Sequence, residues 1–409
     1  MKELSFPQAG ERCFSETLPN GLTVYVFPKN GFSKMHALLA VHYGGSDLHF
    51  ASNGRWQQAP AGTAHFLCRL LQSEGQEKID AFTTADMTGF CVTASEEPYE
   101  RLRELLRAVT LTDFTAEQME ATRAGLAQEL LTQETNPAWR ARQQMLEGLY
   151  PDHLVHTPVM GTIDDLAQIT PEQLNRSHKA FYDAANMVLC VAGDVEARKV
   201  FQLAEMCIPA SAQKTLERNR GTNETPESGS QEQKTEMDVS ASHFALGFKA
   251  DVEPSLRWRI VGELAALLLA GKSSPLHQRL CADGLICGDF AAGFVVENDL
   301  PHFVFSGTSP APERVAEEIM NEAIRISWSG MDEVLFQRVF RSLYGQSLQA
   351  LDSFDQLCLG QARGHFAGEN HLNFPALFAE VTKQEVEELL RESVTGVRSC
   401  LSIVSPEGV

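Results

Sequence analysis

The chain has 409 residues, of which 43% are apolar and 22% charged, and its formal net charge is −20. These proportions are typical of soluble globular proteins and exclude a disordered or membrane-embedded class. Nucleic-acid phosphates bind to basic surfaces, and this chain has a net negative charge and no runs of Lys or Arg. We therefore expect no nucleic-acid partner. The longest apolar run, 264–270, is far shorter than the roughly 20 residues that span a bilayer, and we expect no membrane partner.

A chain of this length is expected to form two domains of about 200 residues each. Its first residues, Met1 to Pro7, contain neither the apolar segment nor the cleavage site of a signal peptide, which predicts a cytoplasmic protein. Nine cysteines are scattered along the chain without a C-x-x-C pair. We therefore expect reduced, mostly buried thiols instead of a disulfide framework.

The first half of the sequence combines strand and helix signals. Asn20-Gly21 lies between extended segments and predicts a hairpin with a two-residue turn. A second strand over 35–43 ends at Gly44-Gly45, and a loop leads from there into a helix that carries His65. The further elements expected in this half are one or two strands over 79–94, helices over 97–109, 115–135 and 139–149, a helix from Pro171, and a strand over 186–194.

Residues 210–237 are polar and rich in Gly, Pro and Ser, which predicts a linker between domains over 1–209 and 238–409. The second half repeats the outline of the first, and this similar order indicates an internal duplication. Its expected elements are a strand over 244–248, a helix over 254–271, strands around Phe290 and over 303–305, helices from Pro312 and Glu333, and a closing strand over 399–404.

The helix that carries His65 contains a pattern H-x-x-C-R, with Cys68 and Arg69 at its end. An inverted zinc motif H-x-x-E-H places two His on one helical face, and the Glu between them takes a proton from the metal-bound water. A thiol is a poor substitute for that carboxylate, and a guanidinium that keeps its charge cannot bind a cation. The helix therefore resembles a zinc-peptidase helix but lacks its carboxylate base and its second metal-binding His.

Several further stretches occur in an order that resembles the pitrilysin/insulinase family of zinc metallopeptidases, the inverzincins. The stretches are Leu18 to Leu22, Gly44 to Ser46, Gly62 to Leu67, Ala81 to Thr83, Gln128-Glu129, Asn136 to Arg140, Gly161-Thr162, Phe181 to Asp194, Lys272 to Leu276 and Asp283 to Ile286. The resemblance implies an α+β fold of two similar α/β-roll domains, each a mainly antiparallel sheet packed with helices.

The family's catalytic residues carry over only in part. His65 matches the first metal ligand and Glu129 the downstream Glu ligand, whereas Cys68 replaces the general base and Arg69 the second His. The segment between this helix and Glu129 is shorter than in the family, and the stretch from Cys281 to Cys287 lacks the Arg and Tyr with which many active relatives hold the peptide. The resemblance therefore implies no catalytic residue and no zinc cofactor.

A hydrogen-bonded pair of Arg69 and Glu129 is our hypothesis for the place that zinc would take. A buried, unpaired carboxylate is costly, and the planar guanidinium supplies matching donors and a positive charge. The alternative is a degenerate zinc site formed by His65, Cys68 and Glu129, because i and i+3 side chains share a helical face.

The resemblance predicts an inactive homologue of a zinc metallopeptidase, acting as the regulatory or peptide-binding subunit of an active paralogue in a heterodimer, or as a homodimer. Ala81, Phe82, Thr83 and Thr84 match the edge strand on which relatives bind peptides by main-chain pairing. The alternatives are a homo-oligomeric scaffold without a peptidase role and a weakly active zinc metalloendopeptidase.

Gly271-Lys272-Ser273 is similar to the end of a phosphate-binding loop. The earlier Gly that such a loop requires is Ala266, and the stretch is expected to end a helix instead of opening one. We therefore predict a structural role for it.

Overall fold

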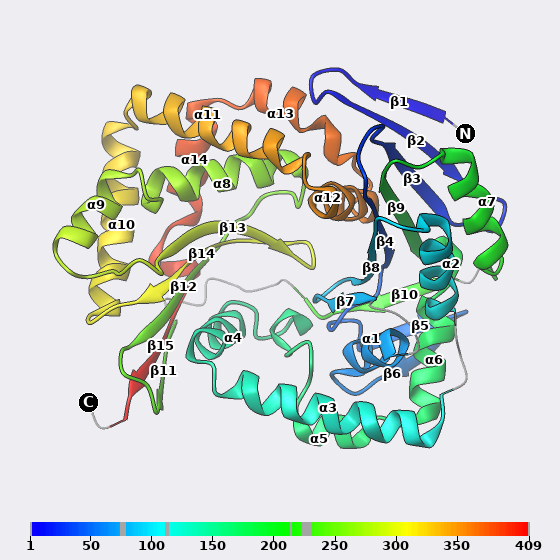
Figure 1. The fold of residues 1–409 in the computed structure, drawn as a ribbon. Coiled ribbons are helices and arrows are strands. Elements are labelled where there is room, and N and C mark those ends of the chain that lie inside the picture. Colours follow the sequence, from blue (N-terminus) through cyan, green and yellow to red (C-terminus); the bar gives the residue numbers. More distant parts are fainter. Residues whose placement is uncertain (1, 74–78, 111–113, 213–214, 223–230, 408–409) are drawn as a thin grey trace. The chain divides into compact units, whose positions relative to one another are not determined.

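The computed structural model describes residues 2–73, 79–110, 114–212, 215–222 and 231–407 (Figure 1). They form two compact units. Unit 1 comprises Met1–Leu130, Thr157–Arg220 and Ser347–Pro375, and unit 2 comprises Leu131–His156, Gly221–Gln346 and Ala376–Val409. Across the described ranges no helix combines the length and the apolarity that a membrane span requires.

Unit 1 is built on a seven-stranded sheet in which only β3 and β9 run parallel. Its strands, in spatial order, are β1 (Lys2–Phe6), β2 (Glu11–Thr17), β3 (Thr23–Pro28), β9 (Met187–Gly193), β4 (Met35–Val41), β8 (Thr88–Ala94) and β7 (Asp80–Thr83). A small second sheet has the order β10 (Leu216–Asn219), β5 (His49–Ser52) and β6 (Arg55–Gln58). The larger sheet therefore ends in β7 at one edge.

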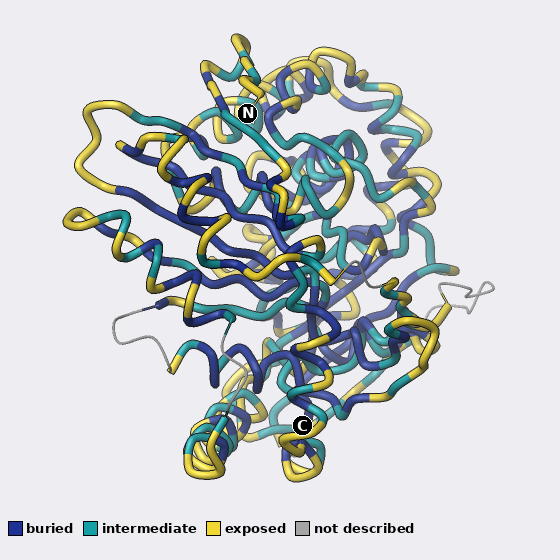
Figure 2. Tube along the Cα trace, turned by 90° about the vertical axis from the view of Figure 1, so that its right-hand side faces the viewer, coloured by how far each residue is buried: buried dark blue, intermediate teal, exposed yellow. Residues whose placement is uncertain are grey.

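Helices cover both faces of the large sheet in unit 1. One face packs against α1 (Thr63–Ser73), α2 (Pro98–Val109) and α7 (Ala197–Cys207), and the other against α12 (Phe354–Phe366). Successive residues of a strand point to opposite faces, so Leu189 joins the core beneath α1 and α2 while Cys190 faces Cys358 of α12. Every residue of β4 and β9 is consequently buried. Figure 2 marks the buried residues of the chain in dark blue.

Unit 2 is built on a five-stranded sheet in which only β11 and β15 run parallel. The strands, in spatial order, are β11 (Gln231–Met237), β15 (Ser399–Pro406), β12 (His243–Lys249), β14 (Leu300–Thr308) and β13 (Ala291–Glu297). Helix α4 (Pro137–Leu149) packs against β11, β12 and β15, whereas α8 (Leu256–Ala270) packs against β13. Unit 2 therefore also has an edge strand, β13.

The other helices, with the 3-10 turns labelled η, complete the two units. They are α3 (Ala116–Glu134), η1 (Leu154–His156), α5 (Ile163–Gln168), α6 (Pro171–Phe181), η2 (Ala184–Asn186), α9 (Pro275–Ala282), α10 (Pro312–Ser329), α11 (Glu333–Ala350), η3 (His371–Asn373), α13 (Phe374–Glu380), α14 (Lys383–Ser393) and η4 (Gly396–Arg398).

Each large sheet is covered on one face by a helix from the other half of the sequence. Helix α4 precedes the expected linker but belongs to unit 2, and α12 follows the linker but belongs to unit 1. The expected domain boundaries of 1–209 and 238–409 thus differ from the compact units. Hydrophobic periodicity marks these segments as helices, but it carries no information about which sheet they cover.

The segment expected to be a linker is structured in part. Residues 223–230 and 213–214 lie outside the described residues, but β10 pairs with β5 in unit 1 and β11 pairs with β15 in unit 2. Arg218 of β10 and Arg220 just after it contact the fully buried carboxylate of Asp47, with Arg220 Nε 2.9 Å from Asp47 Oδ1. The part of the segment that ends at Arg220 is therefore fixed to unit 1 by a sheet and by a buried charge.

All nine cysteines lie in the described residues and are free thiols, five of them buried. The burial expected for most thiols is found at these five positions. The two exposed thiols are Cys281 at the end of α9 and Cys287 in the loop that follows.

A buried histidine in unit 2 predicts acid sensitivity. His302 of β14 is 0% exposed, its Nδ1 lies 3.0 Å from the carbonyl O of Leu300, and burial lowers its pKa to about 4. In the unfolded state the imidazole of His302 binds a proton with a pKa near 6.5, whereas in the folded state it does so only near pH 4. The stability that neutral His302 contributes is therefore complete above about pH 6.5 and is lost as the pH falls below that value. We expect wild type to lose about 2 kcal/mol of unfolding free energy through this residue between pH 7 and pH 5.

The variant His302→Gln cannot titrate in this range, so its loss between pH 7 and pH 5 should be smaller than that of wild type by this amount. Urea unfolding at the two pH values measures the difference. The variant His243→Gln, at the start of β12 in the same sheet, is the matched control. Equal losses in wild type and His302→Gln would contradict the prediction.

Candidate functional site

Helix α1 begins where the chain passes very close to another backbone segment. Gly62, immediately before it, has φ +82°, and a Cβ atom there would lie 2.4 Å from the carbonyl O of Met160. Only glycine fits this approach and this left-handed conformation. The helix is buried over most of its surface and packs against β7, β8 and α6, so its side chains are held firmly in position.

His65 lies next to the carboxylate of Glu129, but its imidazole is uncharged at neutral pH. Its side chain is 10% exposed, and its Nε2 lies 3.5 Å from Glu129 Oε2. Burial and the neighbouring Arg69 guanidinium lower the pKa of His65, and the Glu129 carboxylate opposes them. The imidazole is therefore neutral at neutral pH.

Arg69 and Glu129 form the hydrogen bond that the sequence predicted. Arg69 NH2 donates to Glu129 Oε2 at 3.0 Å, and both side chains are in unit 1. Arg69 NH1 donates to Gln72 Oε1 at 2.9 Å, and Gln72 Nε2 donates in turn to the carbonyl O of Ile79. Gln72 thus holds the guanidinium in place, a role that its i+3 spacing from Arg69 could have suggested and that sequence reasoning missed.

The energetic reason given for this pair needs correction. The Glu129 side chain is 42% exposed and that of Arg69 31%, so water screens both charges. A pair of this exposure stabilises the fold by about 1 kcal/mol or less. The pair therefore matters for the chemistry of the site more than for the stability of unit 1.

Cys68 lies close to Thr83 of the edge strand and is also near the charges of Arg69 and Glu129. Its side chain is fully buried, and burial raises the pKa of its thiol to about 11, although the Thr83 hydroxyl of β7 and the Arg69 charge oppose the shift. The thiol remains protonated at neutral pH. A protonated thiol cannot accept a proton from water, so Cys68 cannot replace the general base.

The residues do not fit a catalytic zinc ion. Such an ion needs about three protein ligands and an open position, and here His65 and Glu129 lie together beside a guanidinium that repels a cation. Within the residues that the structure describes, no three His, Cys, Asp or Glu side chains are arranged to hold a metal. No hydrolytic step can be derived from a zinc ion at this position.

The strand expected to pair with peptides is β7, at the edge of the large sheet. It pairs with β8 on one side, with Ala81 opposite Phe90 and Thr83 opposite Thr88. Thr84 lies beyond the strand, in a turn where its hydroxyl contacts Asp86 and Met87. The stretch 79–94, expected to form one or two strands, forms two, of which β8 is interior and β7 is at the edge.

Known proteins were compared with this chain as a whole. The family described as "Peptidase M16 inactive domain" matches residues 168–343. An uncharacterized zinc protease of Bacillus subtilis, YmfH, is 24% identical over 428 residues that cover 100% of both chains. The zinc protease PqqE of Helicobacter pylori is 25% identical over 299 residues, which cover 65% of this chain and 63% of PqqE.

Solved structures share the fold. An M16-like peptidase from Alicyclobacillus acidocaldarius superposes with a TM-score of 0.89 at 24% identity and covers 97% of this chain and 99% of its own. A peptidase M16 inactive domain from Pseudomonas fluorescens gives a TM-score of 0.79 at 17% identity, with 96% and 98% covered.

These matches support the resemblance of the chain to the pitrilysin, or M16, family. The fold expected from the resemblance, two α+β domains of the pitrilysin type, is confirmed. On α1, Cys68 and Arg69 stand where the H-x-x-E-H pattern of a zinc peptidase has Glu and the second His.

Proposed function

We propose that this pitrilysin-family chain is a non-catalytic subunit that holds peptides and works together with an active relative. The observation that carries the proposal is the Arg69 guanidinium hydrogen-bonded to Glu129 at 3.0 Å, at the position of the motif's second histidine. A permanent cation on that carboxylate takes one metal ligand and repels the metal itself.

The chemistry of the neighbouring residues supports the same proposal. A general base contributes about 10²- to 10⁴-fold to such a reaction, and the protonated Cys68 thiol cannot act as one. His65 keeps a neutral imidazole but stands without the second histidine of the motif. Loss of the base slows hydrolysis by about that factor, and loss of the metal site also removes the metal-activated water.

Peptide holding would survive the loss of chemistry. Strand β7 is an edge, and an extended peptide can add to such an edge through main-chain hydrogen bonds alone. The phenyl ring of Phe82 packs over Gly89, where a Cβ atom would lie 2.3 Å from the ring. Ala81, Phe82 and Thr83 are therefore the proposed peptide-binding residues of the strand.

Metal content tests the non-catalytic assignment. The purified chain is incubated with zinc, exchanged into zinc-free buffer and analysed by plasma mass spectrometry. We expect well under one zinc per wild-type chain, and close to one for the double variant Cys68→Glu/Arg69→His, which restores the H-x-x-E-H pattern. Arg69→His alone is the intermediate control, since it leaves Cys68 in its buried position.

One zinc per wild-type chain would overturn the assignment and favour the weakly active peptidase, for which His65 and Glu129 at 3.5 Å supply two ligands. Partnership is tested separately by co-expression with a family member that has an intact H-x-x-E-H and by native mass spectrometry. A heterodimer supports the proposed role. A stable homodimer that ignores the active relative favours the scaffold instead.

A further inference from the structure

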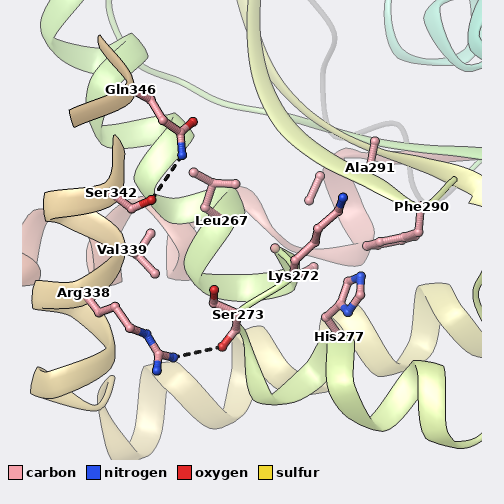
Figure 3. Close-up of a pocket in the computed structure, with 13 residues that line it drawn as sticks. Leu267, Lys272, Ser273, His277, Phe290, Ala291, Arg338, Val339, Ser342 and Gln346 are labelled. Atoms are coloured by element: carbon pink, nitrogen blue, oxygen red, sulfur yellow. Dashed lines mark hydrogen bonds between the residues drawn. The ribbon is translucent and has the colours of Figure 1, made fainter. Parts of the chain in front are cut away.

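A cavity of about 460 Å³ lies within unit 2, whereas the site on α1 belongs to unit 1 (Figure 3). It is lined by the end of α8, the beginning of α9, the start of β13 and the middle of α11. The turn from Gly271 to Ser274 forms one wall. Ser274 Oγ accepts from the His277 N–H and begins α9, and Arg338 NH2 donates to the carbonyl O of Ser273 at 3.3 Å. The volume is typical of small-molecule sites, which span about 300–1,000 Å³.

The permanent charges on the wall of this cavity are all positive. Lys272 and Arg338 line it and no Asp or Glu does, although the chain has 54 acidic and only 34 basic residues. In the described part of the chain, neither cation forms an ion pair with a carboxylate. The cavity therefore has a positive field that the protein itself leaves uncompensated, in a molecule that is acidic overall.

His277 adds a polar but uncharged group. Partial burial and the charge of Lys272 lower its pKa, so the ring is neutral at neutral pH. Its edge lies against the Phe290 ring, with the centroids 5.7 Å apart, and its Nδ1 is 3.6 Å from Cys281 Sγ. The neutral imidazole can accept a hydrogen bond from a ligand or donate one to it, but it adds no charge to the cavity.

The rest of the wall is largely apolar. Ala270, Phe290 and Val339 are buried, and Leu267 extends the same surface. At the rim, Gln346 Nε2 donates to Ser342 Oγ at 3.1 Å. A ligand that offered only charge would leave these apolar side chains in contact with water. The combination of an apolar wall and two cations matches an amphiphilic anion.

We propose that this cavity binds a small organic anion in which a carboxylate is attached to an apolar body. The carboxylate meets Lys272 and Arg338, and the body rests on Phe290 and Val339. A free aliphatic or aromatic acid and the C-terminal residue of a peptide share this chemistry. The site is independent of α1 and of the proposed role of the chain.

The position of the Gly271-Lys272-Ser273 turn argues for a carboxylate held by side chains. The turn follows the C-terminus of α8, where the carbonyl ends of the helix repel an anion, so the backbone cannot cradle phosphate as a phosphate loop does. Charged side chains that extend from the turn and from α11 can still reach a ligand. The phosphate-loop similarity of this stretch thus has no structural counterpart.

Isothermal titration calorimetry on the full chain tests the site with four probes. They are octanoate, its neutral counterpart octanamide, the dipeptide N-acetyl-Ala-Phe with a free carboxylate, and the same dipeptide amidated. We expect at least one carboxylate to bind, and its neutral counterpart to bind about tenfold more weakly or not at all, because each charge-assisted hydrogen bond contributes roughly tenfold.

Three variants assign the binding to this cavity. Lys272→Gln leaves the Arg338–Ser273 contact intact and should weaken binding severalfold, and Lys272→Gln/Arg338→Gln should weaken it about tenfold or more. Arg341→Gln removes an exposed charge from the same helix outside the cavity and should stay within about twofold of wild type. Urea midpoints near the wild-type value confirm that the variants are folded.

Binding of octanoate alone would identify a free acid as the ligand class, and binding of the dipeptide acid alone would identify a peptide C-terminus. Three results would overturn the proposal. They are no binding of either acid, equal binding of acid and amide, and an Arg341→Gln loss as large as that of the double variant.

Discussion

Residues 1–209 expressed alone are expected to be insoluble or unfolded. This fragment contains every strand of the large sheet of unit 1 but lacks α12, which covers β4 and β9 on one face. Removal of α12 exposes Cys190 and its neighbours on that face of the sheet. It also removes Leu357 and Cys358, whose side chains are both 0% exposed. Each fully buried apolar side chain contributes about 1.5–3 kcal/mol, so the loss at these three residues alone is roughly 5–9 kcal/mol. This is comparable with the whole stability of a typical domain, about 5–15 kcal/mol.

Co-expression provides the control for this experiment. Residues 1–220 and 221–409, produced together, supply α12 to the first sheet and α4 to the second, so they should be soluble and purify as a complex. Solubility on lysis and far-UV circular dichroism separate the two cases. A cooperative urea transition of isolated 1–209, near the wild-type midpoint, would show that α12 is dispensable.

Substitution of Asp47 by Ala should destabilise the chain by about 3–5 kcal/mol. The Asp47 side chain is 0% exposed, and those of Arg218 and Arg220 are 19% and 13% exposed. Asp47 Oδ1 accepts from Arg220 Nε at 2.9 Å, and Oδ2 accepts from the Gly44 N–H at 3.0 Å. Removal of the carboxylate leaves two guanidiniums without their anion in a poorly solvated place and frees the segment that follows α7.

Urea unfolding of Asp47→Ala, Asp47→Asn and wild type measures this effect. The Asn variant keeps part of the hydrogen bonding but loses the charge, so its loss should fall between the other two. Asp238→Ala removes an exposed carboxylate just after β11 and should stay within about 0.5 kcal/mol of wild type. If Asp47→Ala behaves like Asp238→Ala, the buried network contributes little to stability.

Local signals in the sequence predicted most elements of the fold. Helix α2 begins at Pro98 and α6 at Pro171, where Pro is favoured in the first turn, and β9 ends at Gly193 as the glycine indicated. The contact of Arg69 with Glu129 could also be predicted, because a carboxylate near a missing metal needs a donor and only one cation adjoined it on α1. These inferences depend on residues close together in sequence or on one site.

Long-range features could not be predicted from the same signals. The hairpin at Asn20 is present, but Thr17 pairs with Thr23, so the loop has five residues. Asn20 does not form the two-residue turn, because its side chain donates to the carbonyls of Ala204 and Ile208 at the end of α7. Similarly, the sequence predicted a linker around Arg218 and Arg220. It gave no sign of their buried partner, Asp47, which is far from them in the sequence.

The assignment of α12 to the first sheet also has a consequence for how the chain is made. Strand β9, the last of that sheet to be translated, ends at Gly193, but its cover is complete only when Phe366 has left the ribosome. At about 5–20 residues per second, this interval lasts roughly ten to thirty seconds. During synthesis the apolar face of β4 and β9 therefore remains uncovered until α12 is made. In this interval the nascent chain is a substrate for chaperones that bind exposed hydrophobic surface.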